Sequence, residues 1–368
     1  MPIVTGRRTA AKLALAASLA PLLGGPAARA ASAARVFAPA PSRDWRRFET
    51  SLTVKLPKTG ATAEVWLPVP GLETAWQHSL DNQWTGNAAA VALHRDPLSG
   101  ARFFAARFDT SVAPELTLTS SFATKNRTID WSQKTNPHED PAVLAAALRP
   151  TASKPLDGLI RATAQQITQG TRGDLEQVRA IYAWIVGHCY RNLATPGCGP
   201  GDARATLTSA GLGGKCADLN GLFVALTRAV GVPARDIYGV RVAPSEFGFK
   251  QLGASGDITG AQHCRAEAWL SGYGWVAMDP ADVLKVMRAE TATWIRDPAD
   301  PLVAGVNAAL FGNWEGNWVG YGTAEDVALP NHKSRLPFLM YPQGRIGTRS
   351  LDELDPKAFS YAITARSI

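Results

Sequence analysis

Hydrophobic and polar residues alternate along the part of the chain that follows residue 45. In residues 48–56 most side chains at every second position are apolar. This period of two predicts a half-buried β-strand. Similar runs, separated by glycine, proline and asparagine, occupy residues 63–67, 103–108 and 116–122. Short strands joined by turns predict a small antiparallel β-sandwich over residues 45–135.

The pattern becomes helical after residue 140. Residues 140–148 and 156–168 have helical character, and the strongest helix lies within residues 211–235. Its apolar residues recur at spacings of three and four, and a glycine and a proline end it: Leu219, Leu222, Phe223, Leu226, Val230, Gly231 and Pro233. Residues 261–283 then read as two strands joined by a tight turn. Together these elements predict an α+β fold.

Cys216 is placed at the start of this helix, directly after Gly213, Gly214 and Lys215. A helix N-terminus stabilises negative charge, so a thiol at that position ionises more readily. The glycines allow a substrate to approach the backbone closely, which makes Gly214 a candidate substrate-binding residue. The alternative is a small apolar side chain packed at a helix start, because free cysteines are usually buried.

The predicted hairpin holds a histidine and an aspartate on consecutive strands, His263 and Asp279. Each is ordinary by itself, as a packed histidine and as a residue that starts a turn before proline. With Cys216 they supply a nucleophile, its base and an acceptor that orients the base. A simple hairpin leaves Asp279 about three residues from His263, or ~10 Å, so we expect a bulge or strand twist to bring them together.

These segments resemble the transglutaminase-like superfamily of papain-type thiol enzymes. The resemblance rests on Gly214-x-Cys216 followed by LFVALTRAVGVPAR and on His263-x-x-x-Glu267 followed by GYGWVAMDP, and it covers residues 155–285. It implies that Cys216 is the nucleophile, His263 the general base and Asp279 its orienting partner. It also implies a catalytic domain over residues 140–290, and a β-rich C-terminal extension, residues 291–368, that packs on the core.

The sequence departs from the family pattern near the base. The family often has an aromatic residue where this chain has Arg265, which by alternation faces the site with Trp269. Arg265 either binds a substrate carboxylate or is an arginine at the surface or paired with Glu267. Trp269 is a candidate substrate contact. Cys264 is expected to point into the core. The Cys216 N–H is one oxyanion donor, and the sequence identifies no second donor.

The first thirty residues have the layout of a secretory signal: basic residues, an apolar run, and small residues around Arg29. Arg7 and Arg8 resemble a twin-arginine export signal, and a general secretory signal is the alternative. Residues 31–44 read as an Ala/Pro-rich linker. We therefore expect a periplasmic or secreted protein that is not inserted in a membrane after signal cleavage.

Composition and charge limit the partners of the chain. With 46% hydrophobic and 19% charged residues it is globular. Without residues 1–30 it has 34 basic against 31 acidic residues, so the net charge of +7 falls to +3. No basic stripe interleaved with aromatic residues is found, which argues against nucleic acid as a partner.

The chain has four cysteines, too few for a disulfide scaffold. Cys189 and Cys198 either form a disulfide across a Gly/Pro loop or are two free buried thiols. The cysteines and histidines lack metal-ligand spacing and the acids do not cluster, so no metal or cofactor is expected. The repeated Gly-Asn-Trp of residues 311–322 indicates a hairpin with packed tryptophans or a sugar- or peptide-binding surface.

These features favour an exported thiol enzyme that attacks an amide bond of a peptide or protein, such as cell-envelope material. It would form a thioester at Cys216 and pass the acyl group to water or to an amine. Hydrolysis is favoured over crosslinking, because no second site for an amine is recognised. The alternative is a catalytically silent module that binds cell-envelope peptides.

Overall fold

The computed structural model describes residues 35–332 and 334–368. The predicted signal segment and the first residues of the predicted linker therefore lie outside the described part of the chain. The described residues belong to one compact unit, and the domain divisions near residues 135–140 and 290 stay predictions. No helix among the described residues is long and apolar enough to cross a bilayer.

The alternating segments form two antiparallel five-stranded sheets. Their first-half strands are β1 (Arg46–Lys55), β3 (Gln77–Gly86) and β6 (Glu115–Thr124) in one sheet, and β2 (Ala63–Pro68), β4 (Ala90–Arg95) and β5 (Arg102–Phe108) in the other. Apolar side chains of both sheets join one buried cluster, which includes Phe48, Val65, Phe108 and Phe122. This is the arrangement expected of a sandwich.

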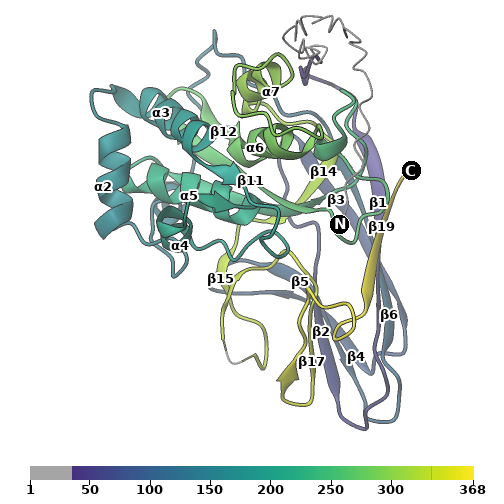
Figure 1. The fold of residues 1–368 in the computed structure, drawn as a ribbon. Helices are drawn as coiled ribbons and strands as arrows, with labels where there is room; N and C mark the ends of the chain where they lie inside the picture. Colours follow the sequence, from purple (N-terminus) through teal and green to yellow (C-terminus); the bar gives the residue numbers. More distant parts are fainter. Residues whose placement is uncertain (1–34, 333) are drawn as a thin grey trace, which may run out of the picture. The chain divides into compact units, whose positions relative to one another are not determined.

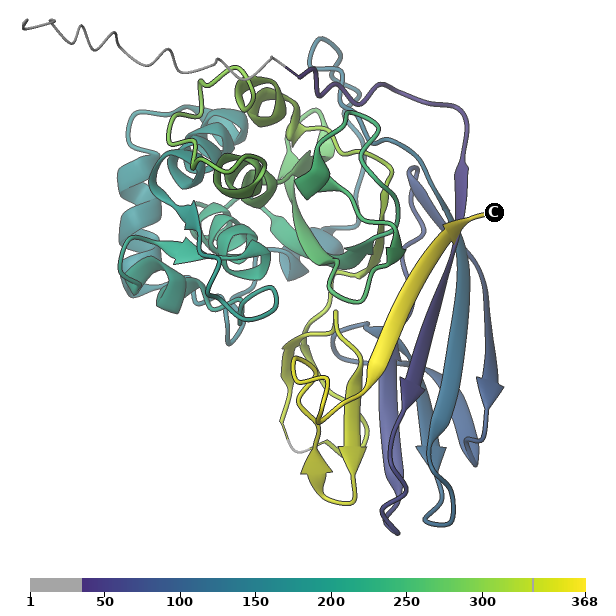
Figure 2. The ribbon, with the colours of Figure 1, turned by 45° about the vertical axis from the view of Figure 1, so that its right-hand side comes forward.

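Both sheets are completed by strands from the far end of the chain. β17 (Gln343–Ile346) pairs with β2, and β18 (Arg349–Ser350) pairs with β17. β19 (Tyr361–Ser367) pairs with β1, so the last strand lies beside the first (Figure 2). The two-residue β10 (Gly256–Asp257) pairs with β19 on its other side. The C-terminal segment is thus β-rich, as the sequence predicts.

The third sheet is built around the predicted hairpin. Its strand order is β13-β12-β11-β9-β14, with β9 (Ala234–Arg241), β11 (Gln262–Leu270), β12 (Gly274–Met278), β13 (Phe311–Gly312) and β14 (Trp318–Gly322). Minor pairs join β7 (Tyr190–Arg191) to β8 (Gly213–Gly214) and β15 (Glu325–Val327) to β16 (Leu336–Phe338). The repeated Gly-Asn-Trp motif leads into β14, and its Trp314 and Trp318 are buried. They pack together with Trp76, which excludes an exposed aromatic surface there.

Seven α-helices accompany this sheet in the described chain. They are α1 (Pro141–Ala146), α2 (Gly158–Ile167), α3 (Gly173–His188), α4 (Ala203–Thr208), α5 (Cys216–Ala229), α6 (Pro280–Ala289) and α7 (Ala304–Ala309), with a short 3-10 turn at Lys250–Leu252. α5 packs on β11 and is surrounded by α2, α3, α4 and α6 (Figure 1). Every residue of α5 is buried, polar ones included. The sequence predicted that only one apolar face of this helix is buried. The buried surface is wider than that, because neighbouring elements cover the helix on all sides.

Candidate active site

Cys216 is the first residue of α5, as predicted, and Asp218 holds the loops around it. The Asp218 carboxylate accepts hydrogen bonds from the backbone N–H groups of Lys215 and Gly201, both at 3.0 Å. A Cβ atom at Gly214 would lie 2.5 Å from the Asp218 side chain, and one at Gly199 would lie 1.8 Å from it. Only glycine at position 214 therefore leaves room for the Asp218 side chain. A substrate role for Gly214 stays a prediction.

His263 and Asp279 form a buried hydrogen bond, with His263 Nε2 2.7 Å from Asp279 Oδ2. In the β11–β12 pairing Ala266 lies opposite Met278, so Asp279 follows the end of β12 opposite Arg265. The offset from His263 is two residues, ~6.6 Å along a strand, rather than three. The pairing contains no register shift. The Asp279 side chain therefore spans the offset without the expected bulge, at the point where the chain turns into α6.

A buried asparagine on the nucleophile's helix fixes the position of Asp279. Asn220 Nδ2 donates to Asp279 Oδ1 at 3.1 Å and to the Cys264 carbonyl at 2.9 Å. Its Oδ1 accepts from Ala281 N at 3.2 Å. Asn220 thus joins α5 to β11 and to the start of α6. The sequence analysis missed it, although a polar residue four positions after Cys216 inside an apolar helix was a usable signal.

A second carboxylate, Asp282, lies behind the histidine. Its Oδ1 is 3.4 Å from His263 Nε2, and Arg241 binds both of its oxygens at 2.5 and 2.7 Å. Burial raises the pKa of Asp282, but Arg241 and His263 outweigh this and hold its pKa below the usual range. Burial by itself would lower the pKa of His263, and Asp282 and Asp279 instead raise it. The imidazolium form is thereby favoured.

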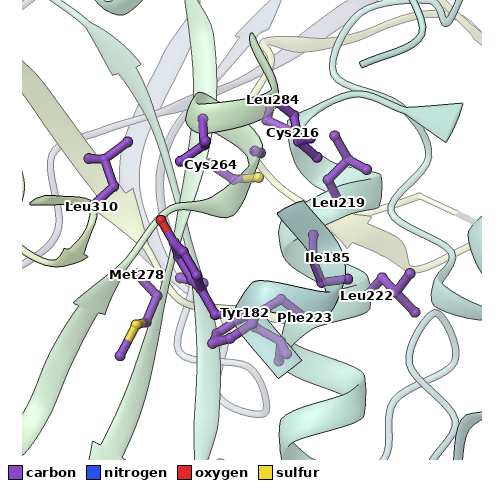
Figure 3. Close-up of a cluster of buried hydrophobic side chains, with 14 of the residues drawn as sticks. Tyr182, Ile185, Cys216, Leu219, Leu222, Phe223, Cys264, Met278, Leu284 and Leu310 are labelled. Atoms are coloured by element: carbon purple, nitrogen blue, oxygen red, sulfur yellow. The ribbon is translucent and has the colours of Figure 1, made fainter. Parts of the chain in front are cut away.

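The Cys216 side chain is 2% exposed. Hydrogen bonds from the thiols of Cys198 and Cys264 lower the pKa of Cys216 well below its usual range; burial opposes this, and His263 adds a hydrogen bond and its charge. Cys264 belongs to the core as predicted, but its thiol also approaches Cys216 at one end of the buried cluster (Figure 3). The site therefore favours a thiolate beside an imidazolium.

The predicted disulfide is not formed. All four cysteines are free and buried, in agreement with the second alternative for Cys189 and Cys198. Burial raises the pKa of Cys189 to about 12, so this thiol stays protonated. Cys198 Sγ instead lies 3.2 Å from the Gln262 carbonyl oxygen and beside Cys216, to which its thiol donates. The loop that contains Cys198 therefore places this thiol next to Cys216 and not in a disulfide with Cys189.

Arg265 does not pair with Glu267, and a substrate role for it stays a prediction that its burial does not favour. It is buried, its Nε lies 3.7 Å from Asp279 Oδ2, and its Nη1 donates to the Glu315 carbonyl at 3.1 Å. Its guanidinium lies over the rings of Trp314 and Trp318, and at 3% exposure it is screened from a substrate carboxylate. Glu267 pairs with Arg127 and Arg235 instead. The alternation along the strand predicted which face Arg265 lies on. It could not show that other residues bury this side chain.

Trp269 lies at the far end of β11, six residues beyond His263. It is opposite Trp275 in the β11–β12 pairing and packs against that ring edge-to-face. Alternation places it on the same strand face as His263, but the length of the strand separates the two. A substrate contact by Trp269 stays a prediction that this placement does not favour.

The ligand atoms of His263, Asp279 and Asp282 lie within 4.8 Å of one another, close enough to hold a metal ion. Protein groups already engage these atoms. Arg241 forms hydrogen bonds with both oxygens of Asp282. One oxygen of Asp279 is bonded to His263 and the other to Asn220. A guanidinium at this site would repel a cation. The donor set fits a base with its orienting carboxylates better than a metal centre.

Residues 161–280 match the model of the transglutaminase-like superfamily. This range contains the whole constellation from Cys216 to Asp279, so the chain contains a transglutaminase-like domain, and the resemblance read from the sequence is confirmed. Members of this superfamily are cysteine-dependent enzymes.

Individual relatives agree with this domain. An uncharacterized protein of Haemophilus influenzae is 37% identical over 232 residues, which are 60% of this chain and 62% of that protein. The chain thus spans less than two thirds of this relative. The crystal structure of a candidate cysteine protease from Cytophaga hutchinsonii has a TM-score of 0.50 at 18% identity and covers 88% of this chain and 98% of that chain. This second likeness shows a shared fold.

A further solved structure is the periplasmic domain of TgpA from Pseudomonas aeruginosa. It has a TM-score of 0.35 at 16% identity and covers 70% of this chain and 96% of that chain.

Proposed function

We propose that this protein is a thiol enzyme that cleaves amide bonds of peptides or proteins through a thioester at Cys216. The observation that carries the proposal is the buried constellation of Cys216, His263 and Asp279. In it, Asp279 Oδ2 forms a hydrogen bond with His263 Nε2 at 2.7 Å. Nδ1 is then the ring nitrogen available to Cys216. Nucleophile, base and orienting group thus come together on three different elements.

The reaction follows from these positions. The Cys216 thiolate adds to the amide carbonyl carbon, and the π electrons of the carbonyl move to its oxygen. The tetrahedral intermediate collapses, the C–N bond breaks, and the His263 imidazolium gives its proton to the leaving amine. The product is a thioester on Cys216. Water or an amine then loses a proton to His263, attacks the thioester carbon and releases the thiolate.

Two donors are proposed for the developing oxyanion. The Cys216 N–H is one, because the first N–H groups of a helix have no intrahelical acceptor. Gln262 is the second: its side chain is 7% exposed, and its Nε2 has no partner among the described residues. It directly precedes His263 and lines the cavity next to Cys198. A buried amide without a partner costs stability, which a substrate oxygen would offset.

Hydrolysis is proposed as the main outcome, with transfer to an amine as the weaker one. The test uses a glutaminyl peptide with and without a primary amine, and it measures ammonia and the peptide products by mass spectrometry. Hydrolysis predicts glutamate formation that added amine barely reduces, whereas an amine adduct as main product would indicate a crosslinker. A Cys216→Ala variant is the control. Peptide binding without any product would indicate a silent binding module.

Export to the periplasm or the cell exterior is proposed from the pattern of residues 1–30, and cell-envelope peptides are the proposed substrates. Replacing the two arginines together, Arg7→Lys and Arg8→Lys, tests the route, because twin-arginine export depends on this pair. Precursor accumulation in the double variant would support this route. Unchanged export would indicate the general secretory route.

A further inference from the structure

A cavity of about 450 Å³ is lined by the neighbours of Cys216 and His263, although these two residues do not line it themselves. Its wall includes Cys198, whose thiol contacts Cys216, and Lys215 and Gln262, which directly precede Cys216 and His263. Tyr341 and Leu354 from the C-terminal segment line it as well. A substrate held in this cavity would therefore lie next to the reacting groups.

The cavity is lined mainly by positive charge. Five basic side chains border it, against Glu353 as the one acid of the lining: Arg191, Lys215, Arg241, Lys250 and Lys285. Asp282 neutralises Arg241 through the two-oxygen contact described above. Across residues 35–332 and 334–368, no ion pair joins the other four to an acid. Elsewhere in the described chain even the buried Lys154 is paired, with Asp236 and Glu325.

These cations lie close enough to repel one another. Burial and the charge of Arg241 lower the pKa of Lys285 to about 8; Asp282 opposes them, Arg191 lowers the pKa further, and Cys216 raises it slightly. Burial and Arg191 likewise lower the pKa of Lys215. Unpaired cations around a partly buried cavity raise the free energy of the empty site. An anion bound among them would lower it again.

We propose that this cavity binds the acidic part of a peptide substrate, and that Arg191, Lys215 and Lys285 select peptides with carboxylates near the cleaved bond. Turnover of such peptides rests on the proposed function, whereas binding does not. The three side chains come from β7, the N-cap of α5 and α6. Arg191 offers a fork for two carboxylate oxygens, and the lysines add compact charges.

A second explanation must be separated from this one. The same cations also favour the Cys216 thiolate, and that role would need no acidic substrate. A thiolate role would change the reactivity of Cys216 toward every substrate alike. A substrate role would change the preference between charged and neutral peptides, so the decisive measurement compares two such peptides.

The experiment measures peptide binding by calorimetry in the full chain with Cys216→Ala, which prevents turnover and removes the thiolate. One probe is a five-residue peptide, blocked at both ends, with glutamate on each side of a central glutamine. The other probe has glutamine at both flanking positions. We expect the acidic peptide to bind at least about tenfold more tightly, with the difference shrinking as salt is raised.

Charge-neutralising variants in the same background locate the effect. Arg191→Gln and Lys285→Gln are each expected to weaken binding of the acidic peptide by about three- to tenfold and to leave the neutral peptide unchanged. Arg161→Gln and Lys58→Gln are the matched controls, because both residues are exposed and lie outside the cavity lining. Circular dichroism checks that each variant is folded. If a variant fails to fold, the salt dependence of binding to the chain with Cys216→Ala alone still tests the inference.

The outcomes keep this inference apart from the proposed function. Equal binding of the two peptides at low salt, or equal losses in the cavity and control variants, overturns the inference. Selective binding of the acidic peptide without cleavage by the native chain supports the site and contradicts the enzyme. Cleavage of both peptides with equal kcat/KM contradicts the site and supports the enzyme.

Discussion

Asp279→Asn changes the charge behind the base with little change of shape. Asp279 caps α6, because its Oδ1 accepts from Asp282 N at 3.1 Å. Asparagine is as good an N-cap as aspartate, so the helix start is expected to survive. The substitution removes the negative charge that faces His263 Nε2 at 2.7 Å. It also puts an amide in a position where the imidazolium requires an acceptor.

The size of the effect follows from that contact. A hydrogen bond to a charged group contributes about 1.5–3 kcal/mol, and 1.36 kcal/mol corresponds to about one pKa unit. Without that contact the imidazolium is less stable, so the pKa of His263 should fall from its raised value. Asp282, at 3.4 Å from Nε2, stays and limits the loss. A less stable imidazolium stabilises the thiolate less, so the pKa of Cys216 should rise.

The assay is the pH profile of Cys216 alkylation by iodoacetamide, read by mass spectrometry. Asp279→Asn should move the midpoint of the profile to higher pH and lower kcat/KM by about 10- to 100-fold. Asp140→Asn is the matched control, because Asp140 caps α1 through Ala142 N and is distant from the site in sequence. A profile in Asp279→Asn that overlays the native one would refute the electrostatic coupling described here.

Two further substitutions separate the groups around Cys216. Cys198→Ala removes the hydrogen bond that lowers the pKa of Cys216 most, so the midpoint of the alkylation profile should rise, and an unchanged midpoint would contradict this assignment. Gln262→Ala should lower kcat by about 10²- to 10³-fold as an oxyanion donor while the alkylation rate stays within about twofold. A parallel loss of alkylation would point to a structural role for Gln262 instead.

Much of the fold could be read from local pattern. The period of two along residues 48–56 gave β1, and the spacing of apolar residues after Cys216 gave α5, because both depend on which side chains are buried. The pairing of β1 with β19 could not be derived. It joins residues some three hundred positions apart, and no local pattern records which strand closes a sheet edge.

The site divides in a similar way. Its three reacting residues were found because nucleophile, base and acceptor have distinctive chemistry. Their supports were missed, since Asn220 and Asp282 act through contacts between elements. Arg265 was misread for a related reason: alternation gives the strand face, but it does not tell that Trp314 and Trp318 cover that face.

The most direct test of the central claim is the alkylation rate of each cysteine at pH 6, in the native chain and in His263→Ala. A free thiol is only ~0.3% ionised at this pH, so a stabilised thiolate gains up to ~300-fold in ionised fraction, reduced by its lower intrinsic nucleophilicity. We expect Cys216 to react at least about tenfold faster than a free thiol and His263→Ala to lose this advantage. A slow Cys216 in both proteins, with the fold intact, would contradict the thiolate–imidazolium pair.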